Sequence, residues 1–112
     1  MRDNGDMPMA STGYIHRGHI DSIIKEAKPL LGPEVLHVAY RIRPDSTDEP
    51  SIFFSVLLTD DGAREDTIVA VTRRVAEVLR EAVRPLEDWG LNPYFNYRTK
   101  SEQERRPDPD WE

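Results

Sequence analysis

Two adjacent aspartates, Asp60 and Asp61, follow an almost wholly apolar segment and are the first candidates for chemistry. Hard divalent cations prefer carboxylate ligands. If that segment is a strand paired antiparallel with the strand before it, Glu34 and His37 reach the same end, and a metal-dependent phosphotransfer or hydrolytic site becomes conceivable. The simpler interpretation is turn and helix-capping chemistry, because adjacent side chains of an extended chain point apart. We favour the turn.

Basic side chains suggest a second chemistry, the binding of phosphates or bases. His37, Arg41 and Arg43 alternate along one predicted strand and therefore share one of its faces. Arg98 and Lys100 come from the last predicted strand and its exit. In one sheet, these residues would form an arginine-rich face able to contact nucleic acid. The alternative is a solvated face whose arginines pair with carboxylates of loops and tail, which a net charge of −6 favours.

Aromatic residues gather in the segment 87–98, EDWGLNPYFNYR. Strand alternation places Tyr94 with Arg98 on one face, and Phe95 with Tyr97 on the other. Trp, Tyr and Arg are the residue types that anchor protein interfaces, so this segment predicts a partner-binding surface on an edge strand. With equal weight, Trp89 and Phe95 could instead close a small core.

Nucleophilic and cofactor chemistry have no visible basis in this chain. The absence of Cys excludes a thiol nucleophile, a disulfide scaffold and a cysteine zinc site. No H-x-x-x-H, G-x-S-x-G or P-loop pattern occurs. We therefore expect no catalytic residue and no cofactor, and the balance is against an enzyme.

The elements that must position these residues follow from apolar spacing. Helices are expected at about residues 19–31 and 63–84, and strands at about 35–43, 52–58 and 94–98. The turn-rich loop 44–50 predicts an antiparallel hairpin. Ser101 and Glu104 fit a capping box at a last helical turn. The order α-β-β-α-β predicts an α+β two-layer domain, with two helices on one face of a small mixed three-stranded sheet.

The 112 residues have room for one domain. We expect a flexible N-terminal arm at 1–18, a single domain at 19–104, and a polar tail at 105–112 in which prolines prevent regular structure. No apolar run could cross a membrane and no signal peptide is visible, so we expect a cytoplasmic protein without membrane contact. Two open sheet edges predict a homodimer or a protein partner.

The runs SIFFSVLLTDDG and PLEDWGLNPYFNYRTKSEQ, with a long amphipathic helix between them, resemble small uncharacterised bacterial proteins of toxin–antitoxin-like gene pairs. The layout is also similar to minimal nucleotidyltransferase domains, whose partners are helical HEPN proteins. Those enzymes carry a Gly-Ser pair and two carboxylates one residue apart. Here Leu31-Gly32-Pro33 has no Ser, and Asp60 and Asp61 are adjacent. The resemblance therefore implies a degenerate, non-catalytic member.

These observations predict a small non-catalytic protein-binding or homodimerising module, with an antitoxin-like role implied by the resemblance. The expected partner-binding residues are Trp89, Tyr94, Phe95, Tyr97 and Arg98. Two alternatives stay open: a nucleic-acid-binding protein that uses the arginine-rich face, and a metal-dependent enzyme at Asp60 and Asp61.

Overall fold

The computed structural model describes residues 17–111. Most of the expected N-terminal arm therefore lies outside the described residues. The elements are α2 (Arg17–Leu31), β1 (Val35–Pro44), β2 (Pro50–Leu58), η2 (Asp61–Ala63), α3 (Ile68–Val83), α4 (Pro85–Trp89), β3 (Asn92–Thr99), α5 (Lys100–Arg105) and η3 (Pro109–Trp111). No helix in this part of the chain has the length and apolar character needed to cross a membrane.

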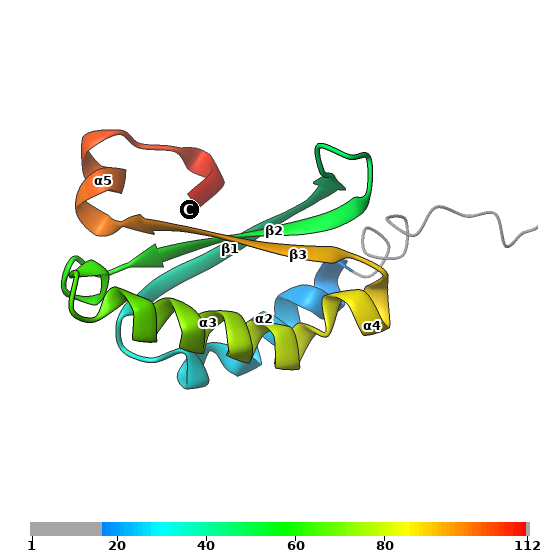
Figure 1. The fold of residues 1–112 in the computed structure, drawn as a ribbon, viewed down its shortest axis with the longest axis horizontal. Coiled ribbons are helices and arrows are strands. Elements are labelled where there is room, and N and C mark those ends of the chain that lie inside the picture. Colours follow the sequence, from blue (N-terminus) through cyan, green and yellow to red (C-terminus); the bar gives the residue numbers. More distant parts are fainter. Residues whose placement is uncertain (1–16, 112) are drawn as a thin grey trace, which may run out of the picture.

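The three strands form one mixed sheet in the order β1-β2-β3. β1 and β2 pair antiparallel, with Tyr40 opposite Phe54, and β2 and β3 pair parallel, with Phe54 beside Phe95. Figure 1 shows α2 and α3 against one face of the sheet, while α5 and the C-terminal segment lie on the other side. The predicted α+β architecture, with a hairpin and two helices on one face, is confirmed.

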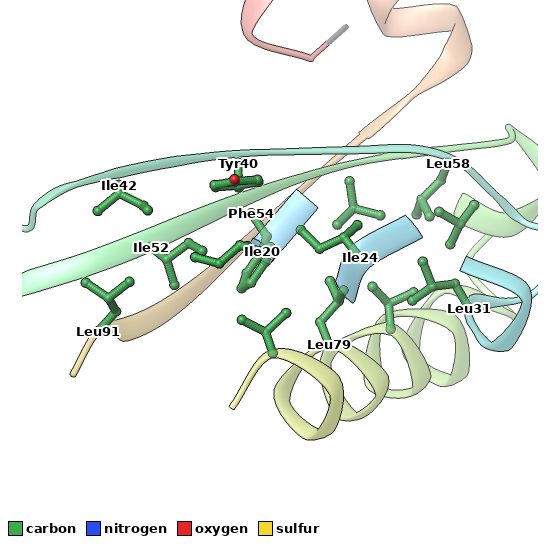
Figure 2. Close-up of a cluster of buried hydrophobic side chains, with 14 of the residues drawn as sticks. Ile20, Ile24, Leu31, Tyr40, Ile42, Ile52, Phe54, Leu58, Leu79 and Leu91 are labelled. Atoms are coloured by element: carbon green, nitrogen blue, oxygen red, sulfur yellow. The ribbon is translucent and has the colours of Figure 1, made fainter. Parts of the chain in front are cut away.

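The core lies between the sheet and the two long helices (Figure 2). Ile20, Ile24 and Leu31 supply the buried stripe of α2, and Leu79 lies on the buried stripe of α3. Phe54 is fully buried at the centre of β2. Full burial of a side chain of this size stabilises the fold by about 1.5–3 kcal/mol. Because this gain requires apolar residues on the buried face of each helix, their spacing along the sequence predicts where the helices lie.

Three local structures differ from expectation. The long helix begins at Ile68 rather than near residue 63, because η2 and a turn precede it. The segment 86–91, expected to be a turn, holds the short helix α4. The capping box joins Thr99 and Glu102, not Ser101 and Glu104, since β3 continues to Thr99 and the helix after it starts earlier.

As far as Trp111, the C-terminal tail holds regular structure, which corrects the expectation that its prolines prevent it. Pro109 begins the 3-10 turn η3, a position at which its missing N–H costs nothing. This turn packs back against β1 and β2, on the side of the sheet away from α3 (Figure 1). The tail therefore belongs to the folded domain.

Candidate functional site

The carboxylates proposed as metal ligands serve separate structural roles. Asp60 accepts hydrogen bonds from the amide and hydroxyl of Ser101, which lower the pKa of its carboxyl group. The side chain of Asp61 is 92% exposed. Glu34 forms an ion pair with Arg74. Between residues 17 and 111, no group of three or more His, Asp or Glu side chains is arranged to hold a metal ion.

Three of the five expected partner-binding residues point toward the helices. The indole Nε1 of Trp89 donates a 3.0 Å hydrogen bond to the carbonyl oxygen of Val83. Phe95 packs against the core. The hydroxyl of Tyr97 donates to the carbonyl oxygen of Thr72 at 3.1 Å, and burial raises the pKa of Tyr97. These three aromatic side chains therefore close the core.

Tyr94 lies on the opposite face, in a row that crosses all three strands. Its ring stacks on Phe53 with centroids 4.9 Å apart and 13° between planes. The guanidinium of Arg43 lies 4.6 Å from the centroid of the Phe53 ring. The Tyr94 hydroxyl donates to Asp45 Oδ2 at 2.7 Å, which raises the pKa of Tyr94. The alternation predicted for β3 thus holds, and only Tyr94 and Arg98 of the expected set reach this face.

The five basic residues proposed to bind nucleic acid are spread over β1, β3 and α5: His37, Arg41, Arg43, Arg98 and Lys100. Arg41 forms a 2.6 Å ion pair with Asp110. Arg98 donates to the carbonyl oxygens of Glu102 and Arg106 and so fastens α5 to β3. Two of the arginines thus contact the chain's own C-terminal part, Arg41 through a carboxylate of the tail and Arg98 through main-chain carbonyls.

The edge of β1 that faces away from β2 carries a feature that the sequence did not indicate. Among residues 17–111, β2 is the only strand that pairs with β1, so the other side of β1 is an edge of the described sheet. Beside this edge lies a hollow of about 210 Å³ between β1 and α2. Its apolar lining comes from Ile24, Leu31, Val38 and Tyr40. Its polar lining comes from Asp21, Lys25, Lys28 and His37.

A second hollow, of about 380 Å³, continues the first around the edge of the strand. It shares Asp21, His37, Val38 and Tyr40 with the first and adds Arg17, Ala39, Arg41, Pro109 and Asp110. We call the two hollows together the β1 slot. The slot is mainly apolar where it adjoins α2, and mainly polar where it reaches Arg41 and the C-terminal segment.

Main-chain groups of β1 also face the slot. The carbonyl oxygen of Tyr40 accepts a 3.5 Å hydrogen bond from Arg17, so it points away from β2. Backbone direction alternates along an antiparallel ladder, and therefore the amide and carbonyl of Val38 point the same way. The phenol of Tyr40 donates to the carbonyl oxygen of Arg17 at 3.0 Å, and burial raises its pKa. This contact fixes the start of α2 beside the strand.

The electrostatics of the slot are predominantly basic. Lys25 and Lys28 stand on α2 at its rim, and neither forms an ion pair with another described residue. Asp21 is the acidic residue on the same helix face. The arrangement offers main-chain hydrogen bonds, an apolar floor and positive charge. In comparisons with protein-family models, curated proteins and solved structures, nothing matches the chain.

Proposed function

We propose that this protein is a non-catalytic binding module that holds an extended segment of a partner protein as an added strand at β1. The β1 slot is the observation that carries the proposal. In strand addition, main-chain hydrogen bonds supply affinity, and pockets for alternate side chains supply specificity. Val38 presents an amide and a carbonyl toward the slot, and side-chain pockets adjoin the strand on both sides.

The lining of the slot defines the chemistry of the partner segment. Alternate side chains of an added strand point to opposite faces of the sheet. One set meets the apolar floor at Ile24 and Leu31, and the other set meets His37 and Arg41. A segment in which apolar residues alternate with acidic ones satisfies both faces, because charge complementarity at the rim favours carboxylates.

The same charges disfavour a second copy of the chain as the occupant. In a two-fold pairing of β1 with another β1, residues of the same sheet face lie beside each other. Basic residues of this face, His37, Arg41 and Arg43, would then meet one another across the two-fold axis, and like charges on neighbouring strands destabilise the pairing. We therefore assign the slot to a different protein.

A defined peptide tests this function. The probe is an acetylated, fluorescein-labelled peptide of eight residues in which valine alternates with glutamate, and binding is followed by fluorescence anisotropy. Val38→Pro removes the amide that faces the slot, and proline is tolerated on an edge strand. We expect this variant to fold with a somewhat lower melting temperature, because Val38 packs against the core. We expect it to bind about ten-fold more weakly, since it loses a main-chain hydrogen bond and admits the added strand poorly.

Two controls make the result specific. A peptide in which lysine replaces glutamate should bind more weakly than the probe, because the rim of the slot is basic. Sedimentation of the protein alone should show a monomer. Equal binding of the probe by Val38→Pro and the parent would contradict strand addition at β1, and a dimer that Val38→Pro dissociates would place a second copy in the slot instead.

A further inference from the structure

We infer that the C-terminal segment 106–111 is a built-in competitor for the polar half of the β1 slot, in which Asp110 holds the position of a partner's carboxylate on Arg41. This inference rests on the proposed function and adds a regulation of the same site. It predicts that a partner strand must displace the chain's own tail to make its full set of contacts.

The position of the segment supports competition. Pro109 and Asp110 form one wall of the second hollow, across from residues of β1. Asp110 Oδ2 lies 2.6 Å from Arg41 Nη1, and η3 packs against β1 and β2. Figure 1 shows this segment returning from α5 over the sheet, on the side away from α3. An added strand with an acidic side chain near Arg41 would require the space that Asp110 occupies.

The attachment of the segment is of a kind that a ligand can replace. Neither α5 nor η3 has a buried residue. Trp111 in η3 is half-buried, and the segment is otherwise fastened by polar contacts, among them a 2.9 Å hydrogen bond from Gln103 Nε2 to the carbonyl oxygen of Asp108. The Arg41 and Asp110 side chains are 53% and 47% exposed, and ion pairs at such exposure contribute little to holding a structure. Regions with few buried apolar contacts open at low cost.

The chemistry of the contact makes the competition selective. A partner carboxylate that replaces Asp110 restores the pair with Arg41, whereas a neutral side chain leaves the guanidinium without its anion. The internal contact thus favours displacement by acidic segments over neutral ones. Lys25 and Lys28 at the rim of the slot favour carboxylates as well.

Three variants of the full chain test the inference. Asp110→Asn removes the carboxylate of the tail with little change of shape. Arg41→Gln removes the guanidinium that the tail and the partner segment would both bind. Asp88→Asn is the matched control, because it removes one charge from the 3.3 Å pair with Arg84, whose side chains are 54% and 51% exposed. This pair lies at α4, which packs against β3 at the other edge of the sheet. Each variant is titrated with the valine–glutamate probe and with a valine–glutamine peptide.

We expect Asp110→Asn to bind the valine–glutamate probe about two- to five-fold more tightly than the parent, the range that an exposed ion pair supplies. Asp88→Asn should bind like the parent. Arg41→Gln should reduce the preference for glutamate over glutamine to the part that Lys25 and Lys28 supply, and in that background Asp110→Asn should have no further effect. Unchanged affinity in Asp110→Asn would overturn the competitor while leaving the proposed function intact. Failure of every variant to bind the probe would overturn both.

Discussion

The hydroxyl of Tyr94 donates a 2.7 Å hydrogen bond to Oδ2 of Asp45, and this contact ties the β1–β2 loop to β3 across the middle strand. The other carboxylate oxygen of Asp45 accepts from the amide and hydroxyl of Thr47 and from the amide of Glu49. Asp45 therefore organises the loop and holds the Tyr94 ring upright against Phe53. One carboxylate thus determines both the conformation of the hairpin and the shape of the exposed sheet face.

Replacing Tyr94 with Phe should isolate this hydrogen bond. The stacking on Phe53 can persist, but the loop loses its link to β3, so we expect the free energy of unfolding to fall modestly. Urea denaturation followed by circular dichroism measures the change. Equal unfolding midpoints for the variant and the parent would mean that the bond contributes nothing to stability.

Stability should decrease in acid partly through Asp45. Its hydrogen bonds with Thr47 and then Tyr94 lower the pKa of the carboxyl in the folded state. A carboxyl whose folded pKa is lowered stabilises the fold above its unfolded pKa of about 3.9, and this contribution is lost as the pH falls below that value. The urea midpoint of the parent should therefore drop below about pH 4, and Asp45→Asn should reduce the size of this drop. The same drop in both proteins would contradict the assignment.

Trp89→Ala should destabilise the fold by about 3 kcal/mol, because the indole packs against the core and bonds to the carbonyl of Val83. Leu86→Ala on the same short helix is the control. Leu86 is 60% exposed, and an exposed substitution of this kind should change stability by less than about 0.5 kcal/mol. Thermal unfolding of both variants measures the difference. If Trp89→Ala unfolded like the parent, Trp89 would belong to a binding surface and not to the core.

Two glycines should respond oppositely to replacement by alanine. Gly32 has φ +101°, and an added Cβ would meet the side chains of Arg74 and Glu34, so Gly32→Ala should destabilise by at least about 1 kcal/mol. Gly18 has open space around it near the start of α2. Gly18→Ala should leave stability unchanged or slightly raised, since alanine favours helix. The two melting temperatures, measured side by side, check both expectations.

Local pattern was sufficient to predict the two long helices and the three strands of this protein. The spacing of Ile20, Ile24 and Leu31 follows the helical period, and the alternation of residues 36–43 follows that of a strand. These patterns arise because one face of each element must leave water, and that requirement acts over a few residues. The fold class and the two faces of β3 follow from the same reasoning.

Only the tertiary structure decided which residues meet. Asp60 lies next to Asp61 in the sequence yet bonds to Ser101, and Arg41 pairs with Asp110 in a tail whose prolines suggested no order. Such polar contacts join residues that are far apart in the sequence, and they produce no periodic pattern from which they could be predicted. Whether β1 is an edge strand depends equally on what pairs with it, and no pattern within residues 35–44 specifies that pairing. The β1 slot therefore exists because the sheet ends at β1, with α2 packed below it and the C-terminal segment folded back beside it.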